Sequence, residues 1–364
     1  MDFTPTEAAA ELGALAGEIA AAISTPERVA ELESAAAPID ARLWQELGGA
    51  GLLGDVSFGP QETTAVATAL GRRLARVPFG PHAVAALPLV RAYGSASLTD
   101  ELVAPAYTGS TVLSAAVEED LARPAPEPRT RLTDGRLTGA KVNVPYAGAA
   151  DALLVSATGD DGPVVAVVRT GAPGVTVTTA PATGLVPVYT VEFDGVVVSG
   201  AEVLTGGVAT VTRLSDLLRL AVCAEQAGVL AAALDATAAY AREREQFGRP
   251  IGSFQAVAQR LADAYIDVQG LSLTTAQAAW LLSPEADAGA AEITAATLTA
   301  KFWADDAGHR VAHTAVHVHG GVGLDTSYPA HRYFLRAKQN EFTLGTAPAV
   351  LDELGGLIGT GALE

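Results

Sequence analysis

The sequence predicts an α+β fold in which helical regions flank a β-rich middle, and three changes of pattern support it. Up to about residue 105 the apolar side chains keep helical spacing, whereas residues 108 to 205 alternate Val and Thr between Gly, Asp and Pro. Long apolar helical segments return from Thr210 onward, as in a buried bundle. We therefore expect an N-terminal helical domain over residues 1–107, a middle β-domain over 108–207 and a C-terminal helical bundle over 208–364.

Local signals define the individual elements. Thr4, followed by Pro5 and Glu7, has the pattern of a helix N-cap with a capping box. In the middle region, runs rich in Val and Thr predict strands near 111–116, 152–157, 163–169 and 175–179. The C-terminal region has three long helical segments, 214–244, 253–282 and 292–318, and shorter ones after Pro329.

Composition narrows the classes of partner and compartment. The formal net charge of −18 argues against nucleic acid or an anionic membrane as the main partner. The single cysteine, Cys223, allows no intrachain disulfide, so we expect a cytoplasmic protein. Residues 1–7 lack the features of a signal peptide, and charged or polar residues interrupt each apolar run, so we expect no membrane span.

The stretch at residues 240–255, Y-A-R-E-R-E-Q-F-G-R-P-I-G-S-F-Q, joins two helices. One helix ends in a charged turn, the chain breaks at Gly and Pro residues, and Ser253 is placed to cap the next helix. Arg244 offers a planar fork of donors suited to phosphate oxygens, and Phe247 offers a flat apolar face. Taken alone, the same residues also fit a charged helix end with an aromatic side chain that packs on the turn.

A second motif, H-V-H-G-G-V-G, occupies residues 317–323 at the end of a long helix. Its adjacent glycines allow close approach of a ligand or another backbone, but taken alone the motif is better explained as a helix C-cap with a Gly-rich turn. His309, His313 and His317 recur every four residues, a spacing that can bind zinc. No carboxylate stands between them as in H-E-x-x-H and no Cys is near, so we expect no metal.

The first of these blocks resembles the R-x-Q-F-G-R-x-I-x-x-F-Q signature of the acyl-CoA dehydrogenase family, flavoproteins that desaturate acyl thioesters between Cα and Cβ. The second is similar to the family's Q-x-x-G-G-x-G, and residues 41–54 are similar to an element of its N-terminal domain. The resemblance covers nearly the whole chain and is densest after Leu214. It implies a C-terminal four-helix bundle, FAD as cofactor and an acyl-CoA substrate.

The resemblance also implies which residues contact FAD. Arg244 would contact the pyrophosphate across a subunit interface, with Phe247 and Gln255 on the adenine side. The second glycine of the other motif would contact the neighbouring subunit's FAD, and a histidine replaces the family's Gln there. The implied cofactor-binding residues are therefore Arg244, Phe247, Gln255, His317, Gly320 and Gly321.

The family's catalytic base is missing at both of its known positions. Most members place a Glu in Y-E-G-T, where this chain has Leu344, and a minority place it where this chain has Leu218. Leucine cannot accept a proton. Two other acids, Glu225 and Glu341, remain candidate bases, with a structural ion pair as the alternative for each.

Other family motifs are also altered. The flavin-side Trp-x-Thr corresponds to residues 143–145, Asn-Val-Pro, and T-E-P-x-x-G-S is reduced to Val-Glu-Glu-Asp at 117–120. The terminal G-T-x-Q corresponds to G-T-A-P at 345–348. These losses indicate a degenerate flavin and acyl site beside a retained surface for cofactor contacts across the interface.

A short chain without the base resembles the partner subunit of heteromeric acyl-CoA dehydrogenases, including those that act on steroid side chains. The resemblance then implies a heterotetramer in which a paralogous subunit supplies the glutamate, and an electron-transfer flavoprotein that takes the electrons. Two other hypotheses remain: a homomeric dehydrogenase that uses Glu225 or Glu341, and a non-catalytic scaffold protein of the same fold.

Overall fold

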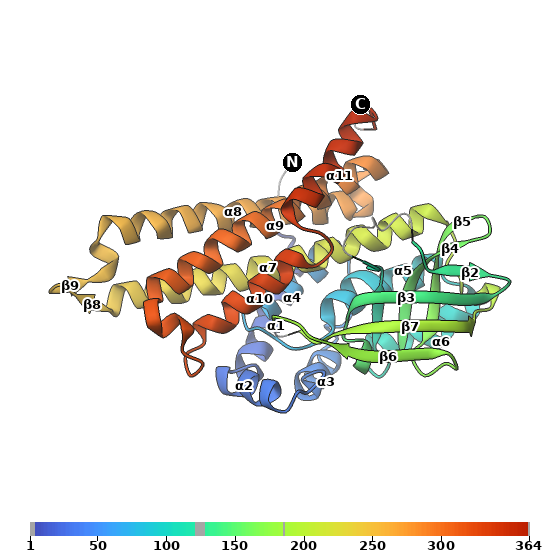
Figure 1. Cartoon of the computed structure of the whole chain (residues 1–364), viewed down its shortest axis with the longest axis horizontal. Helices are drawn as coiled ribbons and strands as arrows, with labels where there is room; N and C mark the ends of the chain where they lie inside the picture. Colours follow the sequence, from blue (N-terminus) through green and yellow to red (C-terminus); the bar gives the residue numbers. More distant parts are fainter. Residues whose placement is uncertain (1–3, 121–127, 185, 363–364) are drawn as a thin grey trace.

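The computed structural model describes residues 4–120, 128–184 and 186–362, and it confirms the α+β prediction (Figure 1). Three long helices run lengthwise through the molecule. They are α7 (Val208–Glu243), α8 (Gln255–Leu282) and α9 (Ala290–His319). The sheet lies beside one end of these helices, and the joint between α7 and α8 projects at the other end.

The N-terminal region is helical, as predicted. Its elements are α1 (Glu7–Ile23), α2 (Pro26–Ser34), α3 (Ala41–Gly49), α4 (Pro60–Gly71), the π-helical turn η1 (Gly80–Ala86), α5 (Leu87–Tyr93) and α6 (Ala96–Tyr107). The predicted cap at Thr4 is wrong, because Thr6 caps α1 by accepting the Ala9 N–H at 3.1 Å. The Thr6 hydroxyl also donates to Glu62 of α4 at 2.9 Å, which explains why the helix starts there.

The middle region forms one mixed sheet. Its strands are β1 (Leu113–Ala116), β2 (Arg131–Thr133), β3 (Arg136–Pro145), β4 (Ala152–Gly159), β5 (Gly162–Arg169), β6 (Val175–Ala180) and β7 (Val188–Val197). The order is β1-β4-β2-β3-β7-β6, with β5 paired to β4. β1 runs parallel to β4 with Leu113 opposite Ala152, and all four of its residues are buried. All four predicted strands are present. β2, which is short and polar, was not predicted.

The C-terminal region is the predicted helical bundle. α10 (Ala330–Phe342) packs against α7 and α9 to complete a four-helix arrangement with α8, and α11 (Ala347–Gly359) is an additional helix against α9. The predicted Ser253 cap of α8 is wrong, because the Ser253 hydroxyl donates back to Pro250 at 2.7 Å and Phe254 occupies the N-cap. The elements change character near residues 107 and 207, and the division into three domains there stays a prediction.

Helix α7 is the core of the molecule. A Cβ at Gly228 would lie 2.0 Å from the Thr68 carbonyl oxygen, so glycine there lets α7 touch α4. Contrary to expectation, α7 is long and apolar enough by composition to cross a bilayer, with a mean hydropathy of 1.6 over its most apolar window. That window is 72% buried inside the structure, as in the core helix of a globular protein.

Candidate functional site

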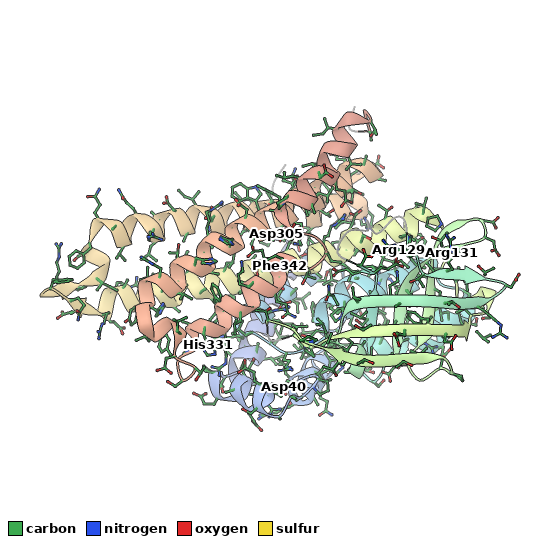
Figure 2. The ribbon with its side chains drawn as sticks, viewed as in Figure 1. Asp40, Arg129, Arg131, Asp305, His331 and Phe342 are labelled. Atoms are coloured by element: carbon green, nitrogen blue, oxygen red, sulfur yellow. The ribbon has the colours of Figure 1, made fainter. Side chains whose placement is uncertain are left out.

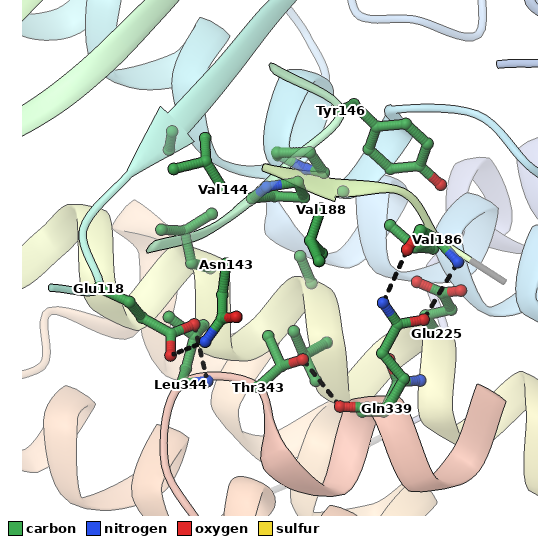
Figure 3. Close-up of a pocket in the computed structure, with 18 of the residues that line it drawn as sticks. Glu118, Asn143, Val144, Tyr146, Val186, Val188, Glu225, Gln339, Thr343 and Leu344 are labelled. Carbon is green, nitrogen blue, oxygen red and sulfur yellow. Dashed lines mark hydrogen bonds between the residues drawn. The ribbon is translucent and has the colours of Figure 1, made fainter. Parts of the chain in front are cut away.

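A cavity opens where the three regions meet, between η1, the ends of β1 and β3, and helices α7 and α10 (Figure 3). It encloses about 710 Å³, its open mouth included. Most of its walls are aliphatic, and valines from five different segments contribute to them: Val77, Val117, Val142, Val144, Val186, Val188 and Val222. A cavity with such walls suits an apolar ligand.

Both positions at which a catalytic carboxylate was sought line this one cavity. Leu218 comes from the middle of α7 and is 6% exposed, and Leu344 comes from the loop between α10 and α11. The Leu344 backbone has a φ of 61°, in the left-handed region, and two polar contacts hold that loop. The Leu344 N–H donates to Glu118 at 3.3 Å, and Lys301 donates to the Gly345 carbonyl at 3.1 Å.

Lys301 is itself held inside the bundle. Its ammonium pairs with Asp305 one helical turn along α9, and both side chains are fully buried. Figure 2 marks Asp305 along the long helices of the bundle. Because a buried ion pair has one preferred geometry, it fixes the direction in which Lys301 reaches the loop.

Glu225, one of the two candidate bases, lines the cavity but is bound to a cation. Arg336 of α10 donates to its two carboxylate oxygens at 2.6 and 2.5 Å, in a bidentate pair. Arg336 also donates to Gln339, whose amide is bonded to both backbone groups of Val186. Glu225 therefore joins α7 to α10, and Arg336 compensates its charge through a bidentate contact.

Glu341, the other candidate, is not part of the cavity lining. Its carboxylate accepts from Lys338 at 2.6 Å and lies 3.2 Å from Nδ1 of His309. The structure therefore separates the two candidates, with Glu225 in the cavity wall and Glu341 in an ion pair on another face of α10.

The second candidate site is at the joint between α7 and α8. The strands β8 (Glu245–Gln246) and β9 (Arg249–Pro250) form a short hairpin whose turn residues, Phe247 and Gly248, have φ values of 56° and 77°. The Phe247 side chain is 92% exposed, with its ring edge-on to Phe254 at 6.1 Å. The edge-on contact with Phe254 leaves most of Phe247 in solvent. Packing within the described chain therefore does not explain why an aromatic residue occupies this turn.

A hollow of about 670 Å³, its open side included, lies beside this hairpin. Phe247 and His317 both line it, so the structure brings two of the predicted residues together from distant parts of the chain. Arg260 of α8 adds a cation to the same wall. The described residues lining the hollow include no Asp or Glu, which suits an anionic ligand.

The other predicted residues lie outside the lining of the hollow. Arg244 is the C-cap of α7 and Gln255 the first residue of α8, so both flank the hairpin. Gly320 ends α9 with a φ of 60°, and a Cβ at Gly320 or Gly321 would meet no atom within 4 Å. Nothing in the described chain requires Gly321 to lack a side chain, which is consistent with approach by a group from outside.

The predicted histidine series of α9, His309, His313 and His317, does not form a chelating group. The rings of His309 and His313 are stacked 4.2 Å apart, and Nδ1 of His313 bonds to the His309 carbonyl. Within residues 4–120, 128–184 and 186–362, no cluster of three or more His, Cys, Asp or Glu is placed to hold a metal ion.

Comparisons with known proteins identify the family of this chain. Residues 205–352 match the family model for the acyl-CoA dehydrogenase C-terminal domain. The chain is 45% identical to acyl-CoA dehydrogenase FadE27 of Mycobacterium tuberculosis, with 98% of each covered, and 34% identical to FadE28 of the same organism, with 83% and 86% covered. The chain belongs to the acyl-CoA dehydrogenase family.

Solved structures of this family show the same fold at full length. A chain of the ChsE4-ChsE5 complex from Mycobacterium tuberculosis superposes with a TM-score of 0.92 at 44% identity, covering 99% of both chains. A chain of the Tcur3481-Tcur3483 steroid acyl-CoA dehydrogenase has the same TM-score at 38% identity, covering 99% of this chain and 100% of that one. The resemblance to the heteromeric steroid type is confirmed, and the chain is a flavoprotein oxidoreductase of the class acting on CH–CH groups.

One acid of this acyl-CoA dehydrogenase was not singled out from the sequence. Glu118 follows β1, lines the cavity, and accepts N–H groups from Asn143 and Leu344, each at 3.3 Å. Burial raises the pKa of its carboxyl, which these hydrogen bonds and the charge of Lys301 only partly offset. Figure 3 shows the carboxyl pointing toward Asn143 and Leu344.

The sequence contains a signal that could have identified Glu118 as an acid facing the cavity. Two acids follow the buried β1, and neighbouring side chains in an extended segment point to opposite sides. Glu119 points away, into an ion pair with Lys141 at 2.8 Å and bonds from the Arg129 and Thr130 N–H groups. Burial opposes ionisation of Glu119, but these bonds lower its pKa to about 2. With Glu119 fixed in this way, Glu118 faces the cavity.

Proposed function

We propose that this chain is the base-lacking subunit of a heteromeric, FAD-dependent acyl-CoA dehydrogenase. The complex converts an acyl-CoA to a trans-2-enoyl-CoA, and a paralogous subunit supplies the glutamate that removes the α-proton. The observation that carries the proposal is the pair of leucines, Leu218 and Leu344, at both base positions around one cavity.

The other acids near that cavity support the same conclusion. A general base needs a carboxylate with free acceptor capacity within reach of the substrate proton. Glu225 is neutralised by the two-point contact with Arg336, and Glu341 lies outside the cavity lining. The homomeric alternative therefore requires breaking a buried ion pair or moving Glu341 around α10.

The hairpin surface is this chain's contribution to the shared site. FAD, when bound, accepts the hydride from the substrate β-carbon. Arg244 would hold the pyrophosphate by charge-assisted hydrogen bonds, while Phe247 and Gln255 would contact the adenine side. His317 would donate an N–H from the wall of the hollow, and Gly320 and Gly321 leave room for the neighbouring chain's cofactor.

We infer the partner subunit, the electron acceptor and the compartment of the complex in the same way. The ChsE4-ChsE5 complex and the Tcur3481-Tcur3483 steroid acyl-CoA dehydrogenase are each named for two different proteins, which supports a paralogous dehydrogenase subunit as partner. An electron-transfer flavoprotein would reoxidise the complex. The net charge of −18 and the buried α7 support a cytoplasmic protein without a nucleic-acid or membrane partner.

An activity assay of the mixed complex tests this proposal. The complex is formed with the paralogous subunit, and flavin bleaching by an acyl-CoA is followed in the absence of an electron acceptor. Glu225→Gln and Glu341→Gln in this chain should keep the bleaching rate within about threefold, whereas replacing the paralogue's glutamate should abolish it. Loss of bleaching on replacement of either acid of this chain, in a folded complex, would overturn the proposal.

A further inference from the structure

Several polar groups that line the inner cavity are bonded within the protein, among them Arg336 to Glu225, Gln339 to Val186, and Asn340 to Gln226. Among the described lining residues, Glu118 is the acid that has no cation in an ion pair with it, and its carboxyl has only two long contacts. The proposed function does not use this carboxyl.

The carboxylate of Glu118 retains unused hydrogen-bond acceptor sites. A carboxylate offers about four lone-pair sites on its two oxygens. Asn143 donates to Oε2 and Leu344 donates to Oε1, both at 3.3 Å, so each oxygen keeps a free site. A protonated carboxyl would still keep an acceptor oxygen, so the capacity to accept a donor exists in both protonation states.

Charge determines which ligands this cavity rejects. Among the described lining residues, Glu225 is compensated by Arg336, whereas Glu118 touches no cation. Lys301 is the cation that acts on it electrostatically, and Lys301 is itself paired with Asp305. An anion that entered the cavity would therefore face an uncompensated acid inside aliphatic walls, which is costly.

We propose that this cavity is a separate ligand site that takes a neutral apolar molecule carrying a hydroxyl group, with Glu118 accepting the hydroxyl proton. The apolar body would pack against Leu218, Leu344 and the valines, and Asn143 would hold the carboxyl in place. The site needs no flavin and no second subunit, so it stands or falls separately from the proposed role in catalysis.

The experiment uses the full chain with methyl-labelled leucine and valine, followed by NMR. The probes are 1-hexanol and pentyl methyl ether, which have the same number of heavy atoms but differ in the hydroxyl donor, and hexanoate as the anion. Hexanol should shift the methyl signals of Leu218 and Leu344 and bind roughly five- to tenfold more tightly than the ether, since one hydrogen bond distinguishes them. Hexanoate should bind more weakly than either at pH 8.

Variants locate the effect at one side chain. Glu118→Met removes the acceptor at similar length and should reduce the preference for hexanol over the ether to about onefold. Glu118→Gln retains an acceptor oxygen and should restore the preference, and Glu341→Met should leave it unchanged because Glu341 is outside the cavity lining. Equal binding of alcohol and ether by the unaltered chain, shifts confined to other methyl groups, or a preference that survives Glu118→Met would each overturn the proposal.

Discussion

Two parts of helix α7 belong to two different candidate sites, the inner cavity and the hairpin at the far end of the helix. Around Leu218 and Glu225 the helix lines an inner cavity where leucines replace the catalytic base and an acid is bound to Arg336. Roughly 30 to 40 Å further along, at about 1.5 Å per residue, it ends at Arg244 beside an exposed aromatic turn. Under the proposed function, the difference means that the chain keeps a surface for a neighbouring subunit's cofactor, whereas its own cavity lacks the catalytic carboxylate.

The largest expected effect concerns the packing behind the cavity. His82 on η1 is fully buried, where its Nδ1 accepts the Leu113 N–H at 2.9 Å and its Nε2 lies 3.1 Å from the Ala106 carbonyl. Burial lowers the pKa of His82 to about 4, against about 6.5 in the unfolded chain. The unfolded state therefore binds the proton first as pH falls, and about 3 kcal/mol of unfolding free energy is lost between roughly pH 6.5 and 4.

Urea unfolding at several pH values checks this expectation. His82→Gln should be less stable at pH 7 and should flatten the decline between pH 6.5 and 4. His317→Gln, at the exposed hairpin surface, should keep the full decline. Equal pH dependence in the native chain and His82→Gln would show that the buried imidazole does not set it.

The second-largest expected effect concerns Glu225 and distinguishes a structural role of this acid from a catalytic one. Glu225→Gln leaves the Arg336 guanidinium, whose side chain is 7% exposed, without its counter-ion. The Glu225 side chain is 25% exposed, so the cost is below that of a fully buried pair, and we expect a loss of about 2 to 3 kcal/mol in unfolding free energy.

The control for Glu225 lies on the same helix. Asp235→Asn breaks an exposed pair with Arg72 and should cost less than about 0.5 kcal/mol. Both changes are measured by chemical denaturation of the full chain. A Glu225→Gln chain as stable as Asp235→Asn would contradict the structural role.

At the other end of α7, Arg244→Ala should act on the cofactor and not on the fold. Loss of a charge-assisted contact to a phosphate is worth about 2 kcal/mol, so FAD should dissociate from the mixed complex roughly 30-fold more readily. Arg242→Ala removes the same charge two residues earlier and should change retention less than about twofold. Equal loss in both variants would indicate a general charge effect.

The smallest predicted effect concerns Phe247. Because its side chain is 92% exposed, Phe247→Ala should leave the unfolding free energy of the chain alone within about 0.5 kcal/mol. In the mixed complex it should weaken FAD retention by about fivefold to tenfold, the size of one aromatic stacking contact. Phe247→Tyr, which keeps the ring, should restore retention.

Local sequence signals predicted the fold and the position of the candidate site at the joint between α7 and α8. The alternation of Val and Thr located β1, β4, β5 and β6, and the Gly and Pro residues of the 240–255 block located the joint between α7 and α8, although not its hairpin, because turn chemistry depends on adjacent residues. The caps at Thr4 and Ser253 were wrong because several hydroxyls compete at each helix start, and contacts such as Thr6 to Glu62 decide between them.

The inner cavity could be predicted only in part. The sequence alone shows leucine at positions 218 and 344, because a residue type can be identified without knowing the fold. Glu118 and Glu225 owe their roles to contacts made 226 and 111 residues away along the chain. No local pattern encodes such distances, so their environments emerge only once the three regions are packed together.

The most direct test of the central claim is the visible absorption spectrum of this chain, purified alone and then co-expressed with its paralogous dehydrogenase subunit. A chain that contributes its hairpin to a neighbouring subunit's cofactor site should be colourless alone and should show the visible absorbance of flavin only in the mixed complex, with about one FAD per pair of unlike chains. A yellow protein from this chain alone, bleached by an acyl-CoA, would contradict the account.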